Sequence, residues 1–151
     1  MSNEVFMRSL GIDYGDRRIG ISVSDSFGWT ASSLGFIDVK KHKDRVLDII
    51  GQYIDEYGVD TIVIGYPLNM NGTKGPRAAV TEDFISQIEE KFPQVKTVKW
   101  DERLTTVAAN RIMRDLNISS RKKGVKDEIA AVLILQSFLD SKIIKEENDN
   151  G

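Results

Sequence analysis

The spacing of apolar residues first changes near residue 40, and that change limits the folds available to this chain. Before residue 40 the spacing is that of strands, because Ile19, Ile21 and Val23 alternate with small residues. From Lys41 to Tyr57 apolar residues recur every three or four positions, as they do on one face of a helix, and strand-like and helix-like segments alternate after that. A chain that begins with consecutive strands and then alternates helices with strands is typical of a mixed α/β sheet.

The first part of the chain predicts three strands. Residues 7–13 are mostly apolar, and Gly15 and Gly20 bracket the turn that leads into the alternating run. These two segments therefore predict a β-hairpin. A third strand is expected within residues 30–39, where apolar side chains stand among small ones.

The second part predicts helices that alternate with strands. The predicted helices span residues 41–57, 79–91, a segment from Thr105 or Thr106 to about Leu116, and 127–143, with predicted strands at 61–64 and 95–100. The β-branched run 61–64 is typical of a buried parallel strand. We therefore predict one domain over 1–144: a five-stranded mixed sheet, antiparallel over its first three strands and parallel over the first, fourth and fifth, flanked by helices. The polar tail 145–151 is expected to be disordered.

Composition narrows the possible chemistry. The chain has no cysteine and a single histidine, His42, which excludes a disulfide framework, a thiolate metal site, a Cys nucleophile and a multi-histidine zinc site. Carboxylates must therefore carry most of any catalysis. The first residues show neither a signal peptide nor a membrane anchor, so we expect a cytoplasmic protein. The net charge of −2 argues against a generally basic nucleic-acid-coating protein but leaves room for a local basic face.

Acidic residues fall where predicted strands end and where the last helix begins. Asp13 ends the first strand, Asp101 and Glu102 follow the last strand, and Asp127 starts the final helix. If the first and fourth strands are parallel neighbours, their carboxyl ends share one sheet edge, and the acids meet there. Clustered carboxylates repel one another unless a cation neutralises them, and Mg²⁺ or Mn²⁺ suits such oxygen ligands. The alternative, more common for any one of these acids alone, is a solvated residue or a helix cap.

Basic residues accompany the acids. The long loop 65–77 is rich in residues that permit unusual backbone angles, and it can present amides, Lys74 and Arg77 to phosphate, although it does not match a P-loop. A basic rim around an acidic centre suits an enzyme that cleaves phosphodiesters. Each basic residue taken alone is more typical of a solvated surface. The other predicted members of this rim are Arg17, Arg18, Arg103, Arg121, Lys122 and Lys123.

Several motifs in order along the chain resemble the YqgF family of bacterial proteins. They are GIDYG at 11–15, GYPL at 65–68, DERLTT at 101–106, and Asp127 followed by the alanines at 130 and 131. The resemblance covers residues 7 to about 141. It implies an RNase H-like fold and either resolution of Holliday junctions or maturation of the 5′ end of precursor small-subunit ribosomal RNA.

The resemblance also implies roles for the acids. Asp13, Asp127 and one of the pair Asp101 and Glu102 would be catalytic and would bind Mg²⁺ or Mn²⁺. Neighbouring strand residues face opposite sides, yet a twist at the strand end admits either member of the pair. One departure from the RuvC-type resolvases is Gly124, which stands where those enzymes place a second acid, one turn before the position of Asp127.

Three functions follow as hypotheses. The leading one is a metal-dependent endonuclease that acts on structured RNA, as a monomer or homodimer. The second keeps the chemistry but cuts four-way DNA junctions, which requires a symmetric dimer. The third is a non-catalytic RNA-binding factor in ribosome assembly. The GIDYG segment also resembles the phosphate-binding hairpin of the sugar-kinase and actin superfamily, whose members need two such domains to enclose a nucleotide.

Overall fold

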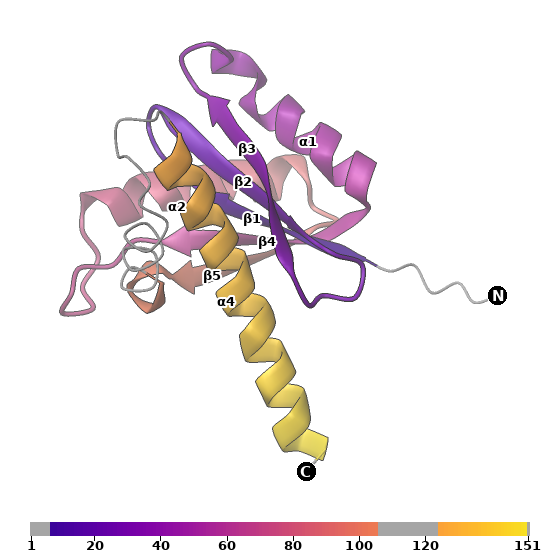
Figure 1. Cartoon of the computed structure of the whole chain (residues 1–151). Coiled ribbons are helices and arrows are strands. Elements are labelled where there is room, and N and C mark those ends of the chain that lie inside the picture. The colour runs from indigo at the N-terminus through magenta and orange to yellow at the C-terminus, as the bar shows by residue number, and fades with distance from the viewer. Residues whose placement is uncertain (1–6, 106–123, 151) are drawn as a thin grey trace.

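The computed structural model describes residues 7–105 and 124–150 and places five strands in one sheet with helices on both faces (Figure 1). The order in the sheet is β3-β2-β1-β4-β5. The strands are β1 (Arg8–Asp13), β2 (Arg18–Ser24), β3 (Ala31–Asp38), β4 (Val59–Tyr66) and β5 (Lys96–Asp101). The helices are α1 (Val46–Tyr57), α2 (Pro76–Lys91) and α4 (Val125–Asn150), with short 3-10 turns η1 (Lys43–Arg45) and η2 (Glu102–Leu104).

The strand directions confirm the predicted mixed sheet. β2 runs antiparallel to both β1 and β3, whereas β4 runs parallel to both β1 and β5. The carboxyl ends of β1, β4 and β5 therefore lie along one edge. At that edge Asp13 pairs with Gly20 of β2, and Tyr66 of β4 pairs with Asp101 of β5.

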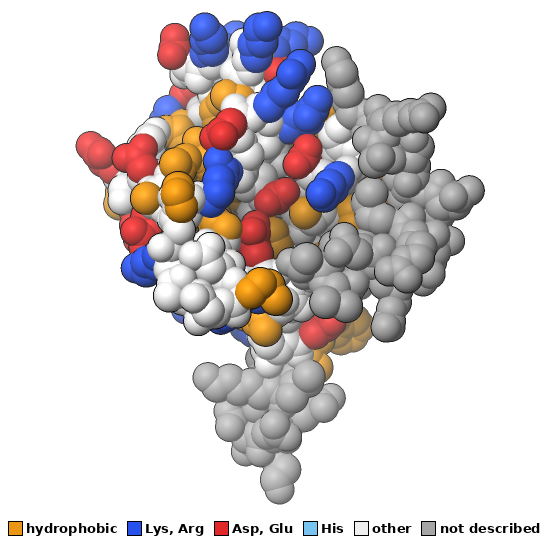
Figure 2. Space-filling view, turned by 90° about the vertical axis from the view of Figure 1, so that its left-hand side faces the viewer, with side chains coloured by type: hydrophobic (Ala, Val, Ile, Leu, Met, Phe, Trp, Pro, Cys, Tyr) orange, Lys and Arg blue, Asp and Glu red, His pale blue; other side chains and the backbone are white. Residues whose placement is uncertain are grey.

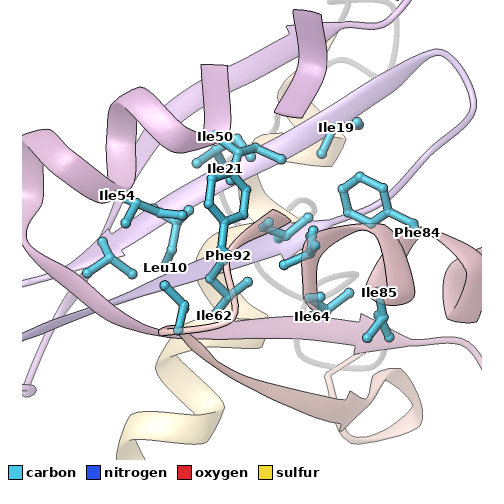
Figure 3. Close-up of a cluster of buried hydrophobic side chains, with 14 of the residues drawn as sticks. Leu10, Ile19, Ile21, Ile50, Ile54, Ile62, Ile64, Phe84, Ile85 and Phe92 are labelled. Atoms are coloured by element: carbon cyan, nitrogen blue, oxygen red, sulfur yellow. The ribbon is translucent and has the colours of Figure 1, made fainter. Parts of the chain in front are cut away.

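The main core lies between the sheet and the layer formed by α1 and α2. Its side chains alternate along the strands, as the period of two requires. Figure 3 shows this cluster, which includes Leu10, Ile21, Ile50, Ile62, Ile64 and Phe92. A smaller cluster lies on the other face, where Ile134, Leu135 and Leu139 of α4 pack against the sheet. Helix α4 crosses β1, β2 and β3 there (Figure 1).

Two glycines let α4 approach the sheet closely. A Cβ atom on Gly20 would lie 2.1 Å from the carbonyl oxygen of Asp127, and one on Gly11 would lie 2.7 Å from the Cβ atom of Leu135. Both contacts are shorter than atoms allow, so a side chain at either position must displace the helix. Because Asp127 belongs to the first turn of α4, Gly20 also sets the position of that acid.

We expect Gly20→Ala to lower the free energy of unfolding by about 1–3 kcal/mol, the usual cost of overpacking. A urea titration followed by circular dichroism measures it. Gly51→Ala in α1 is the control, because its Cβ atom would meet only the ring edge of Phe92, at 3.2 Å. That change is expected to stay within about 1 kcal/mol of the parent, since alanine also favours the helix. Equal losses in the two variants would contradict the close packing of α4.

The structure corrects several predicted boundaries. Helix α2 begins at Pro76 rather than at residue 79, because proline suits the first turn of a helix, where its missing N–H is not needed. Helix α4 continues to Asn150, so the prediction of a disordered tail from 145 is wrong up to that residue. Lys145 and the two glutamates that follow it favour helix and extend it. The helix predicted from Thr105 or Thr106, and most of the loop after it, lie outside the described residues.

Candidate active site

Three of the four predicted acids come together at the carboxyl edge of the sheet. Asp13 ends β1, and its carboxyl group is hydrogen-bonded to that of Glu102, the first residue after β5. Gly65 of β4 makes room for this contact, because a Cβ atom there would lie 2.6 Å from Glu102 Oε1. Asp127, in the first turn of α4, adds a third negative charge that acts on Asp13. We call Asp13 and Glu102 the acid pair.

Burial and mutual repulsion change the ionisation of these acids. Burial, then the charges of Glu102 and Asp127, raise the pKa of Asp13 to about 8. Burial also raises the pKa of Glu102 and that of Asp127. Two carboxyl groups can form a hydrogen bond only if one of them holds a proton. In the metal-free protein Asp13 therefore keeps its proton and donates it to Glu102.

Asp101 has a different environment from Glu102. Its carboxylate accepts hydrogen bonds from Arg103 Nε at 3.0 Å and Arg103 Nη2 at 2.7 Å, and from the Arg103 backbone N–H at 3.0 Å. These bonds lower the pKa of Asp101 and cap η2. Because the strand ends at Asp101 and the chain turns into a 3-10 helix at Glu102, the two neighbours serve different partners. The structure thus places Glu102, and not Asp101, against Asp13.

The donor set of the acid pair fits a hard divalent cation. Two partly buried carboxyl groups in direct contact hold one proton where a cation would relieve the repulsion. Mg²⁺ is commonly bound by one or two carboxylates, completed by water and substrate phosphate, and this pair provides that number. Within the described ranges, no three Asp, Glu, His or Cys side chains are grouped closely enough to hold one metal ion together. A direct ligand role for Asp127 therefore stays a prediction.

Arg77 is the predicted basic residue with the clearest electrostatic effect on the acid pair. Its charge acts to lower the pKa of both Asp13 and Glu102. Its guanidinium reaches from the first turn of α2 to the β1–β2 turn, where it donates to the Tyr14 carbonyl at 3.1 Å and to Asp16 Oδ1 at 2.9 Å. These two hydrogen bonds hold the Arg77 guanidinium beside the acid pair.

The other predicted basic residues divide into three groups. The charge of Arg18, the first residue of β2, acts to lower the pKa of Asp127, and Arg17 is exposed in the β1–β2 turn. Lys74 and Arg103 already bind carboxylates of this chain, those of Glu82 and Asp101. Figure 2 shows acidic side chains in the middle of one face with Lys and Arg side chains around them. Arg121, Lys122 and Lys123 lie outside the described residues.

The backbone at Gly124 disfavours an acid, or any other side chain, at this position. Its φ angle of +82° is one that other residues rarely adopt, and a Cβ atom would lie 2.1 Å from the Phe36 ring. The Phe36 ring therefore occupies the space into which a side chain at this position would project. Among the described residues, the carboxylates that act on Asp13 come from η2 and from the first turn of α4.

Glu82, Tyr66 and Lys99 form a polar cluster with Lys74 that sequence reasoning did not identify. Glu82 is one of several acidic residues on α2, so nothing in the pattern singles it out. Tyr66 stands in the GYPL motif, which was the only available signal. These residues lie together because β4 pairs with β5 and because the loop before α2 brings Lys74 back toward Tyr66.

The raised pKa of Asp13 predicts how the stability of the metal-free protein depends on pH. The folded chain keeps the Asp13 proton up to about pH 8, whereas the unfolded chain loses it near 3.8. This contribution to stability is complete below the unfolded value and is lost as the pH rises through the folded value. Glu82 and Asp101 have lowered pKa values, so their contributions are present above their unfolded values and are lost as the pH falls.

We therefore expect the free energy of unfolding in EDTA, measured by urea titration, to fall between about pH 5 and pH 8. Added Mg²⁺ is expected to restore part of it at the alkaline end, since a bound cation replaces the proton. A profile that stays level or rises across this window would contradict the shared proton.

Comparison with known proteins supports one family. A family model described as "RuvX: Holliday junction resolvase" matches residues 7–141. A protein of Ruminiclostridium cellulolyticum is 54% identical over 135 residues, which cover 89% of this chain and 94% of the relative. One of Acetivibrio thermocellus is 51% identical over 137 residues, or 90% of this chain and 97% of the relative. Both carry the name "Putative pre-16S rRNA nuclease".

Solved structures share the fold at low identity. The yeast mitochondrial Holliday junction resolvase Ydc2 aligns with a TM-score of 0.62 at 12% identity, over 96% of this chain and 82% of that one. Thermus thermophilus RuvC in complex with a Holliday junction substrate aligns with a TM-score of 0.57 at 12% identity, over 91% and 96%. These neighbours confirm the predicted RNase H-like fold. By its family match and its close relatives, the chain belongs to the RuvX family, the YqgF family that its motifs predicted.

Proposed function

We propose that this protein is a metal-dependent endonuclease that hydrolyses phosphodiester bonds in structured RNA, and that its substrate is the 5′ end of precursor 16S ribosomal RNA. The observation that carries the proposal is the partly buried pair of Asp13 and Glu102, with a cation-binding donor set, at the sheet edge where basic side chains gather. The names of relatives more than 50% identical support the choice of RNA. This substrate places the protein in the cytoplasm.

The residues of the site have separate tasks in this proposal. Asp13 and Glu102 hold the cation, for which Asp13 must first give up the proton it shares with Glu102. When bound, Mg²⁺ or Mn²⁺ supplies activation of a water and stabilisation of the leaving oxygen. Arg77 offsets the negative charge of the acids and attracts the phosphate to be cut. Asp127, at the start of α4, completes the acidic surface beside Asp13.

A second candidate is resolution of four-way DNA junctions. It is favoured by the description of the family and by the shared fold of a resolvase bound to a junction. The chemistry at the acid pair would be the same. Junction resolution needs two symmetric cuts and therefore a two-fold dimer, which gives this candidate a separate test.

One assay separates these candidates. The purified protein is incubated with a precursor 16S rRNA fragment or with a synthetic four-way junction, each in Mg²⁺, Mn²⁺ or EDTA. We expect cleavage of the RNA in either metal, none in EDTA, and little cutting of the junction. Preferred cutting of the junction by a dimer would favour the second candidate. Binding of RNA without cleavage in any metal would contradict both and favour a non-catalytic assembly factor.

A further inference from the structure

Three hydrogen-bond donors meet at one carboxylate oxygen at the carboxyl end of the sheet. Tyr66 Oη, Lys74 Nζ and Lys99 Nζ lie 2.5, 3.1 and 3.5 Å from Glu82 Oε1. The donors come from the end of β4, from the loop before α2 and from β5, whereas Glu82 belongs to α2. We call these four side chains the Glu82 cluster. Separate parts of the fold therefore direct their donors at the same point.

Such convergence is the arrangement that binds an oxygen of a phosphate group. The two lysines carry one more charge than the single glutamate neutralises, so the cluster retains a positive surplus. Both ammonium groups also lie near the Tyr66 ring, at 6.0 Å for Lys74 and 5.3 Å for Lys99 from its centroid. This contact helps to keep the two charges in place.

The cluster is open to solvent and lies at the same end of the sheet as the acid pair, on the face covered by α2. The side chains of Lys74 and Lys99 are 66% and 51% exposed. Tyr66 directly follows Gly65, which contacts Glu102, and it pairs in the sheet with Asp101, which directly precedes Glu102. Because neighbouring strand residues face opposite sides, Tyr66 faces α2 whereas Gly65 faces Glu102 and α4, so a nucleic-acid strand must wrap around this end of the sheet to contact both the cluster and the acid pair.

We propose that Tyr66, Lys74 and Lys99 form a subsite for a backbone phosphate of the substrate, and that Glu82 fills this subsite in the free protein. The inference rests on the proposed function only in that the ligand is a nucleic acid. A phosphate oxygen can accept hydrogen bonds from the same three donors, so Tyr66, Lys74 and Lys99 stay paired when a phosphate displaces the carboxylate. Glu82 then competes with phosphate for these three donors. This competition lowers the affinity of the subsite for any phosphate that the rest of the substrate does not hold in position.

The test compares two variants that remove the same charge from the same helix. Glu82→Gln removes the competing charge, and Glu90→Gln, at an exposed position of α2, is its control. Binding of a fluorescent precursor 16S rRNA fragment is measured in EDTA over a range of KCl concentrations. We expect Glu82→Gln to lower Kd by about three- to tenfold at low salt and to steepen the salt dependence by about one phosphate contact. Glu90→Gln is expected to stay within about twofold of the parent.

Lys99→Gln provides the opposite arm. It is expected to raise Kd by about three- to tenfold and to flatten the salt dependence by about one contact. Equal binding by Glu82→Gln and Glu90→Gln, or weaker binding by Glu82→Gln, would overturn the subsite. Unchanged binding by Lys99→Gln would also overturn it, and this arm decides alone if circular dichroism shows that Glu82→Gln does not fold.

Cleavage is measured separately in Mg²⁺, so the two proposals fail in different ways. A parent protein that cleaves RNA while its variants bind alike would overturn the subsite and leave the nuclease proposal in place. A parent protein that binds RNA with the expected variant pattern but never cleaves would support the subsite and contradict the nuclease proposal. Absence of RNA binding by the parent would overturn both.

Discussion

Asp13→Asn is expected to remove Mg²⁺-dependent cleavage and, at the same time, to stabilise the metal-free protein. Asparagine keeps the size of the side chain and can donate a hydrogen bond to Glu102, but it lacks the charge that a cation needs. We expect the single-turnover rate on the RNA substrate to fall at least about 100-fold. The melting temperature in EDTA at pH 7 is expected to rise by at least about 3 °C, because the variant no longer has to hold a proton on a buried carboxyl.

The gain in stability has a specific pH dependence. It is expected to grow as the pH rises toward 8, since the cost of keeping Asp13 protonated grows with pH over that range. Asp55→Asn in α1, an exposed acid, is the control and should change neither rate nor melting temperature appreciably. Cleavage by Asp13→Asn within about tenfold of the parent would rule Asp13 out as a metal ligand.

Glu102→Gln and Asp101→Asn are expected to differ sharply although the two residues are neighbours. Glu102 contacts Asp13 at the proposed cation site, so its loss should lower the cleavage rate at least about 100-fold. Asp101 binds Arg103, and its loss should remove an ion pair while leaving the acid pair intact. We expect Asp101→Asn to lower the rate by less than about tenfold and to lower stability slightly.

The same single-turnover assay, run at several Mg²⁺ concentrations, measures both variants. Glu102→Gln should need far more Mg²⁺ than the parent, and Asp101→Asn should need about as much as the parent. If Asp101→Asn instead needed far more Mg²⁺ than Glu102→Gln, Asp101 would be the metal ligand. The contact of Glu102 with Asp13 would then play no part in catalysis.

The order of strands and helices could be predicted because the hydrophobic period changes so clearly along the chain. The position of Asp13 at a strand end followed from that pattern, and the shared edge followed from the parallel pairing of β1 with β4. The extent of α4 could not be predicted in the same way. Its last turns carry no apolar stripe, so only helix propensity, a weak signal, favours helix there.

The site was predicted in outline but not in its contacts. Sequence placed both Asp101 and Glu102 at the edge, yet the choice between them depends on the residue at which β5 ends and η2 begins. The space that the Glu102 side chain occupies also depends on Gly65, a residue of a different strand that has no side chain to fill it. The Glu82 cluster was missed for the same reason, because its members meet only through the pairing of strands and the return of a loop.

Anomalous diffraction from crystals of this protein grown with Mn²⁺ tests the cation site at the acid pair most directly. We expect a manganese peak within bonding distance of carboxylate oxygens of both Asp13 and Glu102, with their shared hydrogen bond broken. A peak at Asp101 instead, or no peak at the acid pair when Mn²⁺ is in excess, would contradict it.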